Sequence, residues 1–395
     1  MKKRMCAFAI GLAVTMTASP GWTGVDVTQE LAALKEQNRL LMERIGKLEK
    51  QVAENQNTQA EIETKLEKAA QGPMAQLNER VSISGLIEAE ATSGHAFDHT
   101  DSSDISLATV ELGIDANISE WSSGHILFKY EDGTNLRVDE GTITLCNRDK
   151  SPLYLTAGKM YVPFGNFASN MISDPLTLNL GETNEDAVLV GFEKEGFYGA
   201  TYAFNGDVKE IGKDNLIRGV GATLGYGFER EHVSLDTGLG WISNIADSNG
   251  LTDGLNNLGA ENDIAGQVGG ITAHLVYNRN NCGLIAEYTA ATESFNAANL
   301  AFNGQGAKPR AWNLELSHTK EILGHETTFA IGYQGSDEAV ALGLPEARYM
   351  GSIGIGLIDY TSLAFEYIHD EDYEVSDGGT GNDARTVTMQ LAVEF

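Results

Sequence analysis

From Val81 to the final residue, Phe395, the chain is a succession of short segments in which apolar and polar side chains alternate. The last segment shows the pattern clearly, because Val387, Met389 and Leu391 are separated by single polar or small residues. Successive side chains of a β-strand point to opposite faces, so a period of two predicts strands with one apolar and one polar face. The predicted fold class is therefore all-β.

Sixteen strands are predicted, and the links between them alternate in length. The strands are expected at residues 81–92, 104–118, 122–132, 137–148, 152–161, 187–195, 197–206, 217–229, 232–243, 266–278, 282–293, 309–320, 325–334, 345–358, 361–370 and 384–395. Even-numbered links are tight, whereas odd-numbered links are longer, and the longest is expected at 162–186. Strict alternation places turns at one end of the sheet and loops at the other, as in outer-membrane barrels. We predict a 16-stranded antiparallel transmembrane β-barrel over residues 80–395, with both of its ends on the turn side.

Aromatic side chains near the strand ends favour a membrane barrel over a soluble sandwich or propeller, which would also show alternation. An aromatic girdle at each lipid–water interface is typical of such barrels. The predicted girdle contains Trp121, Tyr226, Phe228, Trp241, Trp312, Tyr333, Tyr360 and Phe395. The last strand, ending in phenylalanine, resembles the carboxy-terminal signal of bacterial outer-membrane proteins. Phe395 is therefore expected to be an interface anchor and part of an assembly signal.

Residues 1–24 have the features of a secretory signal peptide. Lys2, Lys3 and Arg4 precede an apolar run over 5–16, and small residues follow. Such a run is too short to cross a bilayer as a helix, and this order of regions is typical of a cleaved leader. The predicted location of the mature chain is the bacterial outer membrane.

Residues 25–72 are predicted to form a coiled-coil oligomerisation segment in the periplasm. Its seam is spaced alternately by three and four residues and comprises Leu31, Leu34, Asn38, Leu41, Ile45, Leu48, Val52, Asn55, Gln59, Ile62, Leu66 and Ala69. A strict 3.5-residue repeat is narrower than the face of a single surface helix, so self-association is favoured over that alternative. Polar residues at core positions fix register or oligomer number, and we expect a dimer or a trimer, with the trimer favoured.

A sixteen-stranded barrel leaves an aqueous channel, so the segment that narrows it controls what passes. The link at 162–186 carries too many apolar side chains for a loop in water, and we expect it to fold into the lumen. An extracellular cap or a trimer-contact loop is the alternative. The predicted constriction residues are Phe164, Phe167, Asp174, Glu182, Glu185 and Asp186.

The lumen-facing positions are mainly acidic. The predicted pore-lining residues are Glu111, Asp115, Lys129, Glu131, Lys159, Glu193, Glu287 and Glu315. The same period-two alternation assigns further acidic residues to the lumen face: Glu88, Glu90, Asp236, Glu366 and Glu394. Arg218 and Arg310 are further candidate cations on that face. Rings of carboxylates favour cations, and a low-dielectric wall strengthens their field.

Sequence motifs for catalysis are absent. The chain has no Gly-x-Ser-x-Gly, no His-Glu-x-x-His and no phosphate-binding glycine loop. Its histidines are dispersed, apart from His95 and His99 in an acidic loop, and the acidic links at 244–265 and 371–383 match no calcium loop. Cys146 and Cys282 are expected on distant strands, too far apart for a disulfide. We predict no enzymatic activity, no cofactor, no metal site and no nucleic-acid partner.

Four features together resemble the siderophore porin family of the legiobactin-uptake (LbtU-like) type: the leader, the short coiled coil, the glycine-rich barrel ending in phenylalanine, and the run GKMYVPFGNF…SNMISDPLTLNLGET from Gly158 to Thr183. The resemblance covers the mature chain and implies passive passage of an iron–siderophore complex. A ferric polycarboxylate is anionic, however, and the predicted lining is acidic. The first expected function is therefore passive uptake of solutes, in particular iron–siderophore complexes. A general cation-preferring porin and a structural barrel that tethers the cell envelope are the alternatives.

Overall fold

The computed structural model describes residues 80–212, 216–259 and 263–395. Leu77–Phe395 form one compact unit. The signal peptide predicted at residues 1–24 and the coiled coil predicted at 25–72 lie outside the described residues. Within the described ranges, no helix combines the length and the apolar character needed to cross a membrane.

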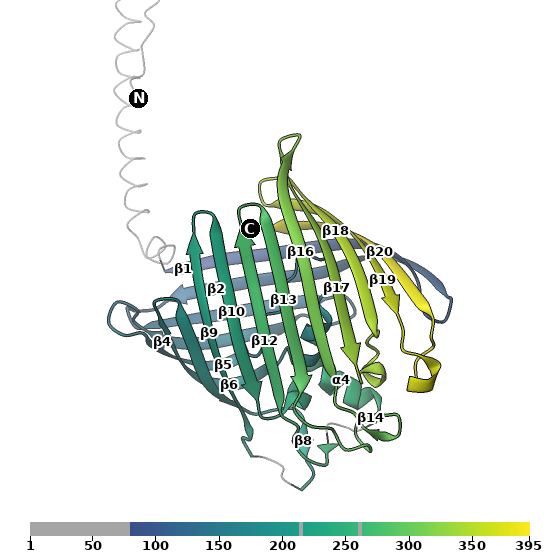
Figure 1. The fold of residues 1–395 in the computed structure, drawn as a ribbon. Helices are drawn as coiled ribbons and strands as arrows, with labels where there is room; N and C mark the ends of the chain where they lie inside the picture. The colour runs from purple at the N-terminus through teal and green to yellow at the C-terminus, as the bar shows by residue number, and fades with distance from the viewer. Residues whose placement is uncertain (1–79, 213–215, 260–262) are drawn as a thin grey trace, which may run out of the picture. The chain divides into compact units, whose positions relative to one another are not determined.

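Sixteen antiparallel strands close into a barrel in which strands adjacent in the sequence pair with each other (Figure 1). The strands are β1 (Val81–His95), β2 (Asp101–Asn117), β3 (Ser122–Glu131), β4 (Arg137–Cys146), β5 (Leu153–Tyr161), β6 (Asn184–Lys194), β7 (Phe197–Phe204), β9 (Gly219–Arg230), β10 (Val233–Ile242), β12 (Gly270–Arg279), β13 (Cys282–Ala291), β16 (Arg310–Ile322), β17 (His325–Asp337), β18 (Ala347–Ile358), β19 (Thr361–Glu371) and β20 (Asp383–Glu394). Each predicted strand has its counterpart, so the prediction of a closed 16-stranded antiparallel barrel is confirmed.

The first and last strands seal the barrel. β1 pairs with β20 from Leu86↔Glu394 to His95↔Arg385. Beyond the end of β20, the backbone N–H of Phe395 donates to Gly85 O at 3.0 Å, and Gly85 N–H donates to Phe395 O at 2.8 Å. A closed barrel leaves no strand edge with unpaired backbone groups, which is the condition for a β-structure to cross lipid.

Short elements lie in the links at the loop end of the barrel. They are α3 (Leu176–Gly181), β8 (Lys209–Glu210), η1 (Ile245–Asp247), α4 (Asn249–Asn257), β11 (Asp263–Ile264), β14 (Ala301–Phe302), β15 (Gln305–Gly306), η2 (Val340–Leu342) and η3 (Val375–Asp377). The sequence predicted that the link after β5 is the longest, and this is wrong: the link at 243–269 is longer than the link at 162–183. The difference arises because β6 begins at Asn184 and β12 begins only at Gly270.

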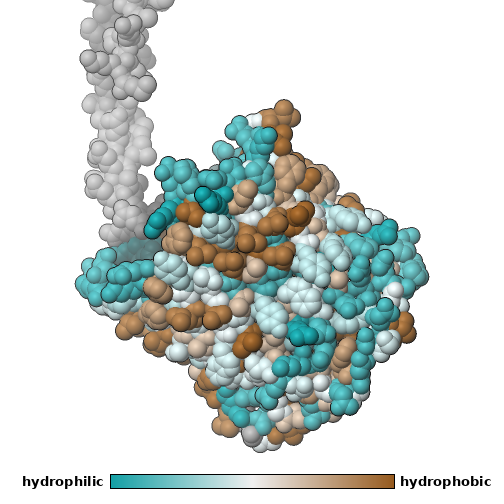
Figure 2. Space-filling model, viewed as in Figure 1, coloured by the Kyte–Doolittle hydropathy of each residue, from teal (hydrophilic) through white to brown (hydrophobic). Residues whose placement is uncertain are grey.

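The two faces of the wall have opposite character. On the outward face Leu239 is 65% exposed and Ile331 is 64% exposed, whereas Glu315 and Gln334 on the opposite face of their strands are fully buried. Figure 2 shows apolar side chains gathered over the strands on the visible face. A barrel that presents apolar groups outward and polar groups inward matches the arrangement expected in lipid.

The buried apolar core lies where two links meet the inner wall. Phe164, Leu176 and Leu180 come from the link at 162–183, and Ile245 and Leu251 come from the link at 243–269. These side chains are 0–2% exposed. The fold therefore concentrates its apolar packing at the loop end of the lumen, around the segments that define the candidate site.

Candidate functional site

The link at 162–183 lies against the inner face of the barrel and is held there by glutamates of the wall. The carboxylate of Glu287 on β13 accepts hydrogen bonds from the backbone N–H groups of Asn166, at 2.7 Å, and Phe167, at 3.1 Å. It also accepts one from the Thr177 hydroxyl at 2.9 Å. Hydrogen bonds to an ionised acceptor are stronger than those between neutral groups.

Two more wall glutamates repeat this arrangement further along the link. Glu315 on β16 accepts from the Ser169 hydroxyl at 2.7 Å and from the Asn170 N–H at 2.8 Å. Glu366 on β19 accepts from the Ile172 N–H at 2.7 Å and from the Ser173 hydroxyl at 2.6 Å. The link thus meets one carboxylate about every three residues.

The strands between these glutamates supply uncharged contacts to the same link. Gln334 on β17 accepts from the Leu176 N–H at 2.9 Å, and the Ser352 hydroxyl on β18 donates to Asn170 O at 2.8 Å. Five neighbouring strands, β13 and β16 to β19, therefore each present one polar side chain to the link. We call Glu287, Glu315, Gln334, Ser352 and Glu366 the anchor row.

The link at 243–269 also turns inward and packs on the first link. The Asn249 N–H donates to Glu182 O at 2.8 Å, and the Asn249 side-chain amide donates to the Glu182 carboxylate at 3.0 Å. Asp247 is buried beside them and accepts from the Val208 N–H at 2.9 Å and from the Asn244 amide at 2.9 Å. Burial raises the pKa of Asp247 to about 7, although both hydrogen bonds oppose the shift.

The inward course of this second link was not predicted from the sequence, in which 244–265 stands out only as an acidic link. Ile245, Leu251 and Leu255 were an available signal, since three apolar side chains in a loop need a surface to pack on. Among the described residues, no three His, Cys, Asp or Glu side chains are grouped closely enough to hold a metal ion.

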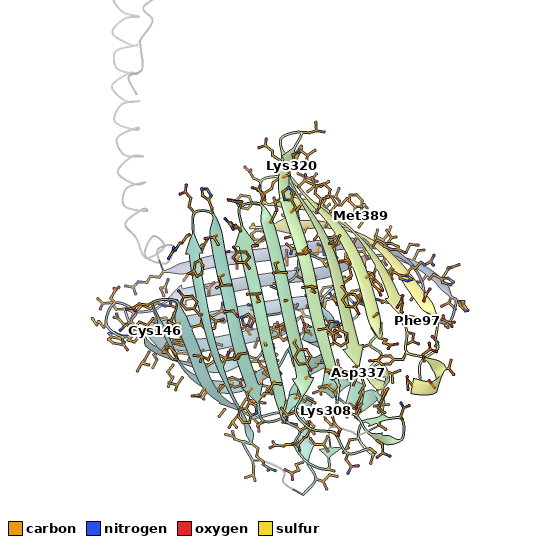
Figure 3. The ribbon with its side chains drawn as sticks, viewed as in Figure 1. Phe97, Cys146, Lys308, Lys320, Asp337 and Met389 are labelled. Carbon is orange, nitrogen blue, oxygen red and sulfur yellow. The ribbon has the colours of Figure 1, made fainter. Side chains whose placement is uncertain are left out.

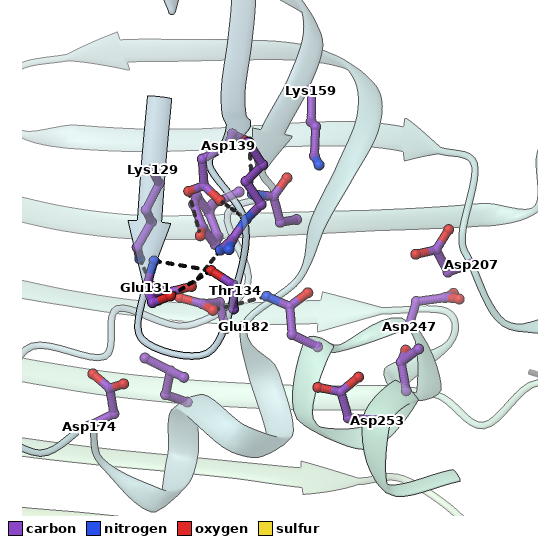
Figure 4. A pocket seen from close by; sticks show the side chains of 16 residues that line it. Lys129, Glu131, Thr134, Asp139, Lys159, Asp174, Glu182, Asp207, Asp247 and Asp253 are labelled. Carbon is purple, nitrogen blue, oxygen red and sulfur yellow. Dashed lines mark hydrogen bonds and ion pairs between the residues drawn. The ribbon is translucent and has the colours of Figure 1, made fainter. Parts of the chain in front are cut away.

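A cavity of about 520 Å³ lies between the two links and the strands β3 to β6 (Figure 4). Seven carboxylates and three cations line it. The acidic residues are Glu131, Asp139, Asp174, Glu182, Asp207, Asp247 and Asp253, and the basic residues are Lys129, Arg137 and Lys159. This volume is in the range of sites for small molecules.

Two of the cavity cations are paired with wall carboxylates. The Lys129 ammonium lies 3.0 Å from Glu131 and 3.5 Å from Glu111. The Arg137 guanidinium lies 2.6 Å from Glu131 and 3.1 Å from Asp139. The Lys159 side chain points into the cavity, and the described part of the chain shows no ion pair for it (Figure 4).

The acidic side of the cavity belongs to the links. The Asp174 side chain is exposed and that of Glu182 is partly buried. Desolvation by the surrounding protein raises the pKa of each carboxyl; Lys129 opposes the shift at Asp174, and the Asn249 amide opposes it at Glu182. The cavity is therefore faced by basic side chains from the barrel wall and by acidic side chains from the links. A solute in that space would experience an excess of negative charge.

The other predicted constriction residues have different positions. Phe164 is buried in the apolar core, and Phe167, which has a left-handed backbone with φ of 55°, lies over Gly165 and Gly181. Glu185 is buried and accepts from the Asp207 N–H at 3.0 Å. Asp186 is exposed and is not among the residues that line the cavity.

The predicted lining residues divide into three groups. Lys129, Glu131 and Lys159 line the cavity itself, and Glu111 lies behind Lys129, 3.5 Å from its ammonium, without lining the cavity. Glu287 and Glu315 are on the inward face, but the link covers them, so they are buried rather than open to the lumen.

The third group lies away from the cavity. Asp115 is 2.8 Å from the His125 ring, and Glu193 is paired with Arg148 at 2.5 Å beside the β4–β5 turn. The suggestion that Arg310 faces inward is wrong, because in the β16 register it lies on the outward face with Trp312 and exposed Leu314.

Comparison with known proteins gives relatives that match most of the chain. No protein-family model matches the sequence. The chain is 33% identical over 358 residues to a UPF0422 protein of Legionella pneumophila strain Philadelphia 1, which covers 80% of this chain and 66% of that protein. A UPF0422 protein of Coxiella burnetii is 29% identical over 315 residues, covering 76% and 66%. The matches thus span slightly less than two thirds of each relative.

Solved structures similar to the barrel are outer-membrane channels. The channel DcaP of Acinetobacter baumannii superposes with a TM-score of 0.56 at 14% identity, covering 80% of this chain and 97% of that one. An anion-selective porin of Comamonas acidovorans has a TM-score of 0.56 at 12% identity, covering 80% and 99%. At these identities the likeness concerns the fold alone. The homologues of this chain are therefore UPF0422 proteins of Legionella and Coxiella, and its fold is that of the outer-membrane porins.

Proposed function

We propose that the protein is a passive outer-membrane channel for small solutes, narrowed by the link at 162–183. The observation that carries the proposal is the anchor row, which holds this link across the inner wall of a closed sixteen-stranded barrel. A barrel of this size otherwise leaves an open aqueous lumen. A segment fixed inside it sets the narrowest opening.

The charges around the cavity support a preference for cations. Lys129 and Arg137 are neutralised by wall carboxylates, while Asp174 and Glu182 add negative charge from the link. Field lines concentrate in a narrow space with low-dielectric walls, so this excess raises the local concentration of cations. In this proposal Asp174 and Glu182 are the selectivity residues of the constriction.

A ferric siderophore is the second candidate solute. Lys159 supports it, because this ammonium points into the cavity and offers a contact for an anionic chelate. The resemblance of the run from Gly158 to Thr183 to siderophore porins supports it independently. The excess of carboxylates opposes an anionic complex, so cations are the better supported solutes.

Planar-bilayer recordings of the purified protein test the proposal. We expect discrete conductance steps and a reversal potential in a salt gradient that indicates cation preference. The double variant Asp174→Asn, Glu182→Gln should move that potential toward zero, whereas Glu193→Gln, beside the β4–β5 turn, should leave it unchanged. Absence of conductance would refute the channel, and a structural barrel that tethers the envelope would then be favoured.

A ferric chelate added to the same recordings separates the two candidate solutes. Concentration-dependent block that weakens in Lys159→Gln would support siderophore passage. The outer-membrane location implies contact with lipids, and we further propose self-association through residues 25–72. Cross-linking of the full chain should give dimers or trimers that are lost when residues 27–70 are removed.

A further inference from the structure

The turn between β1 and β2 brings two imidazole rings together at the loop end of the barrel. His95 is the last residue of β1, and His99 follows in the turn with a left-handed φ of 67°. The His99 Nδ1 atom lies 3.4 Å from the His95 Nε2 atom, and the ring centroids are 5.6 Å apart. Both rings are outside the channel site described above.

Hydrogen bonds fix the backbone that carries these rings. The Ala96 N–H donates to Thr100 O, and the His99 N–H donates to Ala96 O, both at 2.9 Å. The side-chain amide of Asn382, in the link between β19 and β20, donates to Phe97 O at 2.9 Å and ties the tip of the turn to its neighbour. Figure 3 labels Phe97 at this tip. The backbone positions from which the two rings project are therefore fixed by the turn.

A carboxylate orients the first ring. Asp101 Oδ1 lies 2.8 Å from the His95 Nδ1 atom, so that nitrogen carries the proton and donates it to the carboxylate. The lone pair of the neutral ring is then on Nε2, the atom that faces His99. A histidine that ligates a metal commonly donates its other N–H to a carboxylate in this way.

The separation of the two facing nitrogens fits a shared metal ion. Imidazole ligands lie about 2.0–2.1 Å from Zn²⁺ in tetrahedral sites, which places two of them about 3.3 Å apart. The observed 3.4 Å agrees with this value. We propose that His95 Nε2 and His99 Nδ1 together bind one borderline divalent cation, such as Zn²⁺ or Cu²⁺, at the loop rim of the barrel.

The surroundings make this an open site. The His95 side chain is 42% exposed, so an ion can reach it from solution. The described residues hold no cluster of three or more potential ligands, which leaves the remaining coordination positions to water. Arg385 lies opposite His95 in the strand register, while the acidic residue Asp98 lies in the turn and Asp101 begins β2.

Calorimetric titration of the full chain, purified in detergent without a histidine tag, tests the site with ZnCl₂. The expected result is one ion per chain, with affinity at least tenfold weaker in His95→Gln and in His99→Gln. Asp101→Asn should weaken binding about tenfold, as loss of an orienting carboxylate does. His125→Gln is the matched control, because His125 has the same 2.8 Å contact with a carboxylate, Asp115, and should bind zinc like the parent chain.

The same proteins titrated with Cu²⁺ provide a spectroscopic check. The parent chain should give a paramagnetic resonance spectrum with coupling to two nitrogens, and each histidine variant should lose one. If His99→Gln binds zinc as tightly as the parent chain, or if the parent chain binds no stoichiometric ion, the site does not exist and the two rings share only a hydrogen bond. Either histidine variant alone decides whether the metal site exists. The channel recordings test the proposed function separately, so their outcome does not depend on the metal site.

Discussion

The anchor row predicts that replacing one wall glutamate loosens one part of the inward link. Glu315→Gln keeps the volume of the side chain but replaces an oxygen acceptor with an NH₂ donor. At Glu315, two donors of the link, the Ser169 hydroxyl and the Asn170 N–H, would compete with each other and with the Asn313 side-chain amide for the one remaining oxygen. The site is fully buried, so water does not replace the lost partner.

The size of the effect follows from the number of bonds. A hydrogen bond to a charged group contributes about 1.5–3 kcal/mol, so loss of one bond and weakening of the other amounts to roughly 3 kcal/mol. Every 1.4 kcal/mol is a factor of ten, and local opening of the link should therefore become about 100-fold more frequent.

Hydrogen exchange in detergent measures this opening residue by residue. The Asn170 amide should exchange about two orders of magnitude faster in Glu315→Gln. The Asn166 and Ser173 amides should change less, because Glu287 and Glu366 still hold them. Single-channel recordings of the variant should show additional current noise.

Glu193→Gln serves as the control, since this residue pairs with Arg148 away from the link. Its exchange pattern over residues 166–173 should equal that of the parent chain. An unchanged Asn170 amide in Glu315→Gln would refute the view that the wall carboxylates hold the link in place.

Three further predictions concern the fold and its pH dependence. The pKa of Asp247 is about 7 in the folded chain against an ordinary 3.8, so its protonation contributes to the stability of the folded link; this contribution is complete below about pH 4 and is lost as pH rises through 7. The backbone amides of 245–252 should therefore be better protected from exchange at pH 5 than at pH 8, after correction for intrinsic exchange. Asp247→Asn should remove that difference. Gly158→Ala should lower the yield of folded barrel, measured as the fraction whose electrophoretic mobility changes on heating, because φ is 134° and the new Cβ would lie 2.1 Å from Gly141 O. Gly133→Ala is the control: its Cβ would have nothing within 4 Å, so this variant should fold normally apart from a backbone cost of about 1 kcal/mol. Deletion of Phe395 removes the backbone bonds beyond the end of β20 and should reduce the folded fraction in outer membranes, and unchanged assembly would exclude its role as a signal.

The barrel could be predicted because its pattern is local. A period of two fixes which face each side chain occupies, and tight turns mark where the chain reverses, so strand number and link alternation follow without knowledge of distant contacts. The link at 162–183 also carried a local signal, since its apolar residues needed cover. The comparable signal at Ile245 and Leu251 is weaker, because these apolar residues are interspersed with acidic and polar ones.

The sequence by itself determined that residues beyond Val81 alternate between an apolar and a polar face and that Glu287, Glu315 and Asp174 carry charge into the interior. Only the tertiary structure decided that the first two are buried beneath the link while Asp174 borders the cavity. The reason is that periodicity assigns a side chain to a face, whereas its exposure on that face depends on what folds over it. Here the covering segment lies more than 100 residues away along the chain, as in the bond from Asn166 to Glu287, and no local pattern encodes such a contact.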